Sequence, residues 1–268
     1  MWVYEIVQTT IVISSTKPYG MTSGWKQFEI ACSENQGEVI TVTVSPVKSS
    51  GIYQNIERIA SQTKVTHILR HENDYMLCDD HYIHNQILPV CNPESIDLFL
   101  LQLFYTHAVH RQMIQLHAAT IEDQGRGILF LGPSGIGKTT QAERWAEFRG
   151  ASIINGDVGF VQRTAREYIA WGTPWHGSSP YCLNASVPVK ALVVLKQAPE
   201  NRLRELTGFE KVSEIAGSVF YPTWLEDGME LCTDTLNHLL TDLPVYRLDN
   251  RADRESVEIL AKELDRIT

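Results

Sequence analysis

The residues best suited to chemistry form one short stretch, ILFLGPSGIGKTT, at residues 128–140. It contains the complete G-x-x-x-x-G-K-[ST] pattern, in which glycines permit a tight turn and backbone N–H groups surround phosphate oxygens. Lys138 is expected to reach the β- and γ-phosphates, and the Thr139 hydroxyl is expected to hold Mg²⁺. The sequence therefore predicts a site for ATP, or another nucleoside triphosphate, with Mg²⁺. The positions expected to bind the nucleotide are Gly132, Pro133, Ser134, Gly135, Ile136, Gly137, Lys138, Thr139 and Thr140.

Chemistry at this loop depends on the elements that flank it. The apolar residues 128–131 predict a buried parallel strand, and residues 140–148 predict a helix. The N-terminal end of that helix would face the phosphates with its free N–H groups. A glycine-rich turn that fits the pattern by chance is the plain alternative. The strand before the loop and the helix after it favour nucleotide binding.

The rest of the chain predicts an α/β protein with two domains. Residues 1–91 are rich in β-branched and aromatic residues separated by turn-prone segments, which predicts a small β-rich domain. That domain is a candidate for recognising a peptide or a partner protein. Residues 92–268 contain the phosphate loop and alternate between strand and helix patterns, which predicts a catalytic P-loop domain. Its expected architecture is a mixed sheet flanked by helices.

Composition narrows the function classes. The net charge of −9 disfavours broad binding to nucleic acid or anionic lipid. The sequence has no apolar run of about 18 residues, and its first ten residues do not resemble a signal peptide. Five scattered cysteines without C-x-x-C spacing favour a reducing compartment. We therefore expect a cytoplasmic protein with no nucleic-acid or membrane partner.

The motifs resemble a known family. LHAATIEDQGRGILFLGPSGIGKTT, followed by SIINGDVGFV, resembles the catalytic domain of HPr kinase/phosphorylase, which is related to phosphoenolpyruvate carboxykinase. The closer resemblance is to stand-alone HPr-kinase-like proteins encoded near peptide-modifying genes, including kinases of lasso-peptide precursors. It covers roughly residues 90–250 and is sharp at 116–140 and 153–157. It implies an HPr kinase-type fold and ATP- and Mg²⁺-dependent phosphorylation of a hydroxyl, above all serine, on a peptide or small protein. HPr kinases assemble as hexamers, so the resemblance also implies that this protein could form a homo-oligomer.

The resemblance also implies roles for individual residues. It assigns Lys138 to the phosphates, Thr139 to Mg²⁺, and His117 to a place near the transferring phosphoryl group. HPr kinases carry two adjacent aspartates after the phosphate-loop helix, whereas this chain has Asn-Gly-Asp, with Gly156 at the first position and Asp157 at the second. Asp157 would then serve the metal or the acceptor hydroxyl. A buried core histidine and a simple Asn-Gly turn are the alternatives.

A long irregular stretch, residues 172–188, is the last candidate region. A connection of this length inside a compact domain is usually functional or disordered, and its aromatic residues argue against disorder. His176 could act as a base, a hydrogen-bond donor or a phosphate contact. Trp175 and its aromatic neighbours could equally anchor the loop on the sheet. The stretch is therefore interpreted either as an acceptor-binding loop or as a packed connection.

Three functions remain open from sequence. The first is a kinase for a peptide or small protein, with Asp157, His117, Lys138 and His176 as catalytic candidates and Thr139 and Asp157 as metal ligands. The second is a phosphohydrolase in which water replaces the acceptor. The third is a nucleotide-gated module that binds a peptide without phosphoryl transfer. Fold alone does not choose among them.

Overall fold

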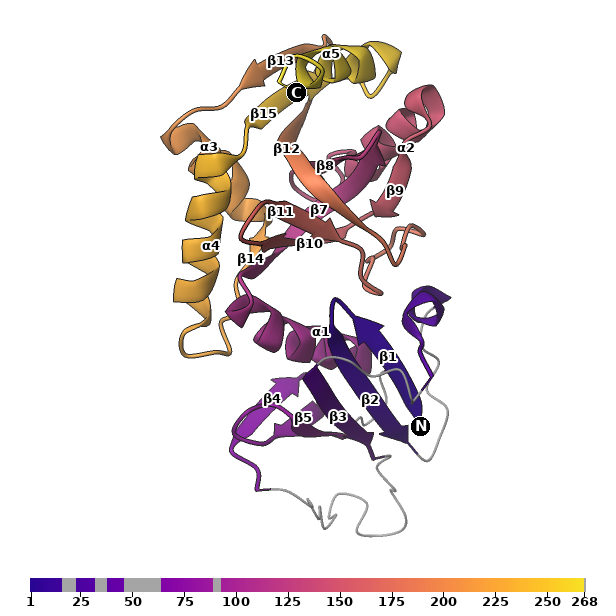
Figure 1. Cartoon of the computed structure of the whole chain (residues 1–268), viewed down its shortest axis with the longest axis vertical. Coiled ribbons are helices and arrows are strands. Elements are labelled where there is room, and N and C mark those ends of the chain that lie inside the picture. The colour runs from indigo at the N-terminus through magenta and orange to yellow at the C-terminus, as the bar shows by residue number, and fades with distance from the viewer. Residues whose placement is uncertain (16–22, 32–37, 46–63, 89–92, 268) are drawn as a thin grey trace. The chain divides into compact units, whose positions relative to one another are not determined.

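The structure is a computed structural model that describes residues 1–15, 23–31, 38–45, 64–88 and 93–267. The chain forms two compact units, residues 1–106 and 107–268, and the division falls within helix α1, Pro93–His110 (Figure 1). The boundary predicted from sequence, between residues 91 and 92, lies outside the described residues.

The first unit is built on a six-stranded sheet with the order β1-β2-β3-β6-β5-β4. β3 runs parallel to both β2 and β6, and the other neighbours are antiparallel. Buried and less buried side chains alternate along β3 and β5, as expected for strands with one face on a core. The predicted β-rich N-terminal region is therefore confirmed. The elements are β1 Trp2–Ile6, β2 Thr9–Ser15, η1 Ser23–Phe28, β3 Glu38–Val44, β4 His67–His71, β5 Asp74–Cys78 and β6 His84–Leu88.

The second unit contains a nine-stranded sheet with the main order β11-β10-β7-β8-β12-β15-β13, and β9 and β14 also pair with β7. β8, β12 and β15 are parallel, whereas β7 pairs antiparallel with its neighbours, so the sheet is mixed as predicted. The elements are β7 Met113–Asp123, β8 Arg126–Leu131, α2 Lys138–Arg149, β9 Ser152–Asn155, β10 Val158–Arg163, β11 Tyr168–Trp171, β12 Ser186–Gln197, β13 Arg202–Glu205, α3 Phe209–Ile215, η2 Ala216–Ser218, β14 Val219–Phe220, α4 Gly228–Asp242, β15 Val245–Asn250 and α5 Arg254–Leu264.

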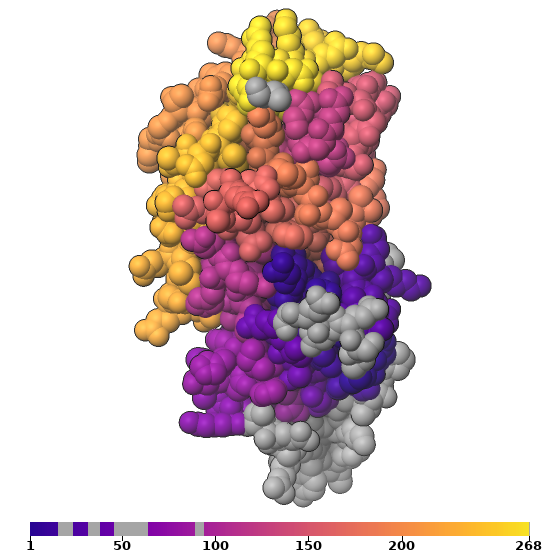
Figure 2. Space-filling model, in the orientation of Figure 1, coloured from indigo at the N-terminus to yellow at the C-terminus, as the bar shows by residue number. Residues whose placement is uncertain are grey.

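Helices α2 and α5 cover one face of the parallel strands. Trp145 of α2 and Leu260 of α5 belong to the same buried apolar cluster as Phe130 of β8 and Val193 of β12. Figure 2 shows helix α5, in yellow, at the surface of the second unit. Its charged residues Arg254, Glu255, Glu258 and Lys262 are exposed. This packing fixes the start of α2 at the carboxyl end of β8, which is where a phosphate loop must lie.

No helix in the described ranges has both the length and the apolar character needed to cross a membrane. The most apolar long helix is α1, with 18 residues, and it packs many of its side chains against protein. Its apolar residues are therefore explained by burial in a protein core.

Candidate functional site

The phosphate loop has the backbone that its glycines permit. Between β8 and α2, Gly132, Gly135 and Gly137 have φ angles of 140°, 77° and 105°, a region that side chains disfavour. A Cβ on Gly135 or Gly137 would meet no described atom within 4 Å, so these two glycines are required for backbone conformation rather than for space. Gly137 precedes α2 and has no side chain to cap it. The first N–H groups of α2 therefore lack a side-chain cap and suit an anion.

Lys138, the first residue of α2, is folded back over this loop. Its Nζ donates to the carbonyl oxygens of Gly132 at 3.1 Å and Pro133 at 3.3 Å, and the residue is 6% exposed. Burial lowers the pKa of the Lys138 amine, and the Asp157 carboxylate opposes that shift. The amine is thus held within the loop by carbonyl acceptors that phosphate oxygens can replace.

Thr139 connects the phosphate loop to the acidic segment, residues 155–157, which carries Asp157. Its hydroxyl donates to the carbonyl oxygen of Gly156 at 3.2 Å. β9 and β10 both pair antiparallel with β7, so Gly156 and Asp157 interrupt what is otherwise one extended strand. The interruption places the acidic segment directly beside the start of α2.

Asp157 pairs with His117, which lies 40 residues earlier on β7. The distance between Asp157 Oδ1 and His117 Nε2 is 2.8 Å, and the two side chains are 32% and 22% exposed. The backbone N–H of Ala118 also donates to the Asp157 carbonyl at 3.0 Å, which fixes the register of the pair. The sequence-predicted residues Lys138, Thr139, Asp157 and His117 are thereby brought to one place, where Asp157 and His117 are partly exposed.

Asn155 organises the same segment and was missed as a functional residue in the sequence. Its Oδ1 accepts from the N–H groups of Asp157 at 3.0 Å and Val158 at 2.9 Å. Its Nδ2 donates to the carbonyls of Trp175 at 2.7 Å and Thr173 at 3.3 Å. The side chain is fully buried. Asn-Gly predicts a turn, and only the fold reveals that this asparagine also holds a distant loop.

That loop, the 172–185 segment, has no regular secondary structure apart from one β-bridge, between Cys182 and Asn155. Trp175 is 3% exposed, and its ring centroid lies 6.5 Å from that of Phe160, so it anchors the segment on the sheet. His176 is half-buried, and its Nδ1 is hydrogen-bonded to the carbonyl of Ser179 within the segment. The packed-connection interpretation fits Trp175, while a catalytic role for His176 stays a prediction.

Gly156 is where the resemblance to HPr kinases expects an additional aspartate. A Cβ on Gly156 would lie 1.8 Å from the Oγ and 2.4 Å from the Cβ of Ser179. The volume that a side chain at residue 156 would need is therefore already filled by Ser179. The sequence at residue 156 shows only that the aspartate of HPr kinases is missing. It does not show that Ser179 fills the space.

The donor groups fit a magnesium ion that arrives with a nucleotide. Among the residues that the structure describes, no group of three or more His, Cys, Asp or Glu side chains gathers to hold a metal on its own. The Thr139 hydroxyl and the Asp157 carboxylate offer oxygen donors beside the loop. Mg²⁺ in phosphate sites typically takes one or two protein oxygens and completes its shell with phosphate and water. The two donors match that pattern.

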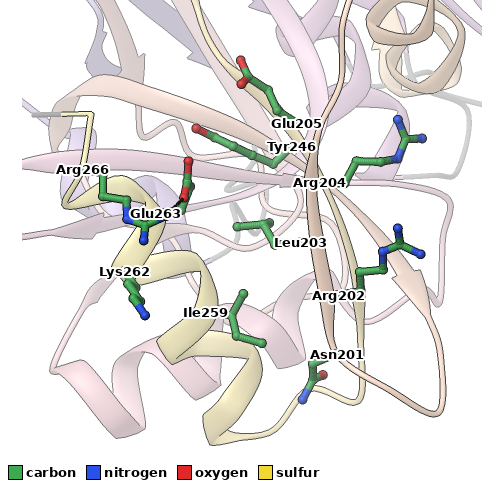
Figure 3. A pocket seen from close by; sticks show the side chains of 10 residues that line it. All are labelled: Asn201, Arg202, Leu203, Arg204, Glu205, Tyr246, Ile259, Lys262, Glu263 and Arg266. Carbon is green, nitrogen blue, oxygen red and sulfur yellow. Dashed lines mark hydrogen bonds and ion pairs between the residues drawn. The ribbon is translucent and has the colours of Figure 1, made fainter.

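A separate pocket of about 400 Å³ lies among β13, β15 and α5 (Figure 3). Leu203 and Ile259 form its apolar part, while the charged ends of Arg202 and Lys262 point to different sides. Its other two cations are engaged, since Arg204 pairs with Glu210 and Arg266 pairs with Glu263. The pocket therefore does not bring its charges together on one ligand, in contrast to the phosphate loop.

The fold and the site together define an α/β protein whose glycine-rich loop, at residues 132–139, lies beside an Asp–His pair. Residues 92–248, more than half of the chain, match the family described as SynChlorMet cassette protein ScmC, and the chain belongs to this family. No curated protein matches the chain. Among solved structures it is similar to the Hpr(Ser) kinase/phosphatase from Coxiella burnetii, at 13% identity and a TM-score of 0.35, over 56% of this chain and 94% of that chain.

Proposed function

We propose that this protein is an ATP- and Mg²⁺-dependent kinase that transfers the γ-phosphoryl group to a hydroxyl, above all serine, of a peptide or small protein. The observation that carries the proposal is the position of the Asp157–His117 pair. The pair adjoins the phosphate loop through the hydrogen bond from Thr139 to Gly156 and lies within electrostatic reach of Lys138. The resemblance of residues 116–140 and 153–157 to HPr kinases supports the same reaction.

Phosphoryl transfer needs positioning and charge neutralisation more than covalent help. The loop N–H groups and Lys138 would hold the β- and γ-phosphates, and Thr139 and Asp157 would hold Mg²⁺. When bound, the ion would neutralise phosphate charge. With a proton on Nε2, His117 donates to Asp157 Oδ1 and orients the carboxylate. These groups together provide a fixed arrangement of charge around a γ-phosphate.

The reaction is balanced by the groups present. The acceptor oxygen forms a bond to the γ-phosphorus, the bond to the β–γ bridging oxygen breaks, and the nucleoside diphosphate leaves. With Asp157 assigned to Mg²⁺, the acceptor proton passes to solvent. The 172–185 segment lies against Asp157, since a Cβ on Gly177 would be 2.1 Å from its Oδ2.

The test uses the full chain with γ-labelled ATP, Mg²⁺ and a degenerate peptide library with serine, threonine or tyrosine at the central position. Peptide label is identified by mass spectrometry, and free phosphate is measured in parallel. We expect label on serine peptides, and we expect Asp157→Asn to lose it while nucleotide binding is retained. Asp234→Asn, at an exposed position of α4, is the matched control and should behave as wild type.

The two competing functions give different results in the same experiment. Free phosphate without peptide label would identify a phosphohydrolase. Nucleotide binding with neither product would identify a gated binding module. Either result would overturn the kinase proposal.

A further inference from the structure

Gly156 and Ser179 share a volume that one side chain fills. Ser179 is 7% exposed, and its Oγ lies 1.8 Å from the place where a Cβ on Gly156 would be. Gly156 does not have a left-handed backbone, so space alone excludes a side chain there. Ser179 is therefore seated against the backbone of the acidic segment, one residue before Asp157.

The turn that carries Ser179 also presses on Asp157 itself. A Cβ on Gly177, where φ is 58°, would lie 2.1 Å from Oδ2 of Asp157. The other carboxylate oxygen, Oδ1, is 2.8 Å from His117 Nε2. The carboxylate is thus held between a histidine on one side and the glycine backbone on the other.

Ser179 ties this turn together and attaches it to Gly156. Its N–H donates to the carbonyl of His176 at 3.2 Å, and its carbonyl is bonded to His176 Nδ1. Its Oγ accepts from the N–H of Tyr181 at 3.3 Å, and the carbonyl of Tyr181 accepts from the N–H of Gly156 at 3.2 Å. Removing the Ser179 side chain therefore removes the bond from the Tyr181 N–H and empties the volume beside Gly156.

We propose that Ser179 is a positioning residue: it seats the turn on Gly156, sets Gly177 against Asp157, and so fixes the carboxylate for the metal and nucleotide. The inference rests on the proposed function, because it concerns the orientation of the residue that would hold Mg²⁺. Residues behind a metal ligand typically change metal affinity by about 10- to 100-fold when they are removed. Ser179 would act on Asp157 indirectly, through its contact with the backbone of the preceding residue, Gly156.

The shared volume allows a reciprocal exchange as the test. Ser179→Gly empties the volume, Gly156→Ser overfills it, and the double variant Gly156→Ser with Ser179→Gly restores one serine side chain to it. Ser178→Ala is the control, because Ser178 is the adjacent serine and is exposed. Each full-length variant is measured for Mn²⁺ affinity in the presence of ADP by calorimetry, for the rate of peptide phosphorylation, and for thermal unfolding.

We expect Ser179→Gly to weaken Mn²⁺ binding about 10-fold or more and to slow transfer to a similar extent, because Asp157 loses its fixed orientation. The double variant should recover to within about threefold of wild type, a coupling that independent sites would not show. Ser178→Ala should match wild type. If Gly156→Ser does not fold, Ser179→Gly still tests the proposal, since it removes atoms and creates no clash.

The results separate this inference from the proposed function. Wild-type affinity and transfer in folded Ser179→Gly would overturn the inference alone. A folded double variant no better than Ser179→Gly would also overturn it. A wild-type protein that binds ADP and Mn²⁺ but never labels a peptide would overturn the proposed function, while a loss of Mn²⁺ affinity in Ser179→Gly would still support the positioning role.

Discussion

The phosphate loop and the 172–185 segment are held in place beside Asp157 by different means. The phosphate loop is local, because Lys138 bonds to carbonyls five and six residues earlier in the chain. The 172–185 segment is held by a residue distant in the chain, Asn155. The side-chain oxygen of Asn155 accepts hydrogen bonds from the N–H groups of Asp157 and Val158. Its amide nitrogen donates to the carbonyls of Thr173 and Trp175 in the segment. One is a sequence motif, and the other exists only when the sheet has formed.

Glycine has a different purpose in the phosphate loop and at residue 156, beside the 172–185 segment. Gly135 and Gly137 of the phosphate loop have open space around them and are needed for a left-handed backbone. Gly156 has an ordinary backbone and is needed because Ser179 occupies the space beside it. Gly135 and Gly137 are therefore constrained by backbone conformation, whereas Gly156 is constrained by its contact with Ser179.

The largest expected effect follows from removing the residue on which the 172–185 segment depends. Asn155→Ala deletes two acceptor and two donor contacts of a fully buried amide. We expect the free energy of unfolding to fall by about 3 kcal/mol, because buried polar groups lose their partners. Urea unfolding measures this, with Asn237→Ala on the exposed side of α4 as the control. A change below about 1 kcal/mol would mean that the segment holds itself.

The next effect concerns ligand binding through the phosphate loop. Lys138→Ala should weaken ATP binding about 100-fold, or about 2.7 kcal/mol, because it removes the cation that would contact the β- and γ-phosphates. Its effect on stability should be smaller than that of Asn155→Ala. Calorimetry with ATP, with the exposed Lys262→Ala as control, tests the expectation. An unchanged affinity for ATP in Lys138→Ala would mean that the loop does not bind the nucleotide.

The phosphate loop and its flanking strand and helix could be predicted from the sequence, because their structure depends on residues close together in the chain. The predicted strand at 128–131 lies within β8, and the predicted helix at 140–148 lies within α2, Lys138–Arg149. The segment at 172–188 was also correctly predicted to be irregular up to the start of β12, at Ser186. In each case glycines, prolines and apolar runs specify the backbone without reference to distant residues.

The sequence could not predict the contacts that complete the site, because they join residues far apart in the chain. His117 and Asp157 come together only through the pairing of β7 with β10, and a lone histidine on a strand otherwise reads as a core residue. Gly156 suggested a missing carboxylate, while the structure fills the volume with Ser179. Such exchanges of volume between distant residues leave no mark in a single sequence.

A smaller effect distinguishes a glycine needed for space from one needed for backbone. Gly177→Ala and Gly125→Ala both place alanine at a positive φ, 58° and 78°, so both should lose about 1 kcal/mol of stability. Only the Gly177 variant puts a Cβ 2.1 Å from Asp157 Oδ2, whereas the Cβ at Gly125 meets no described atom within 4 Å. We expect transfer to fall about 10-fold in Gly177→Ala alone. Equal transfer rates in the two variants would show that the carboxylate adapts.

The smallest effect is expected where the 172–185 segment contacts α2, the helix that follows the phosphate loop. The Tyr181 hydroxyl of the 172–185 segment donates to Glu143 of α2 at 3.0 Å, and this bond raises the pKa of Tyr181. Tyr181→Phe keeps the ring and removes an exposed bond that water can replace, so peptide transfer should stay within about twofold of wild type. Parallel transfer assays with Gly177→Ala test the ranking. A larger loss of peptide transfer in Tyr181→Phe would mean that α2, rather than Asn155 and Ser179, holds the 172–185 segment against Asp157.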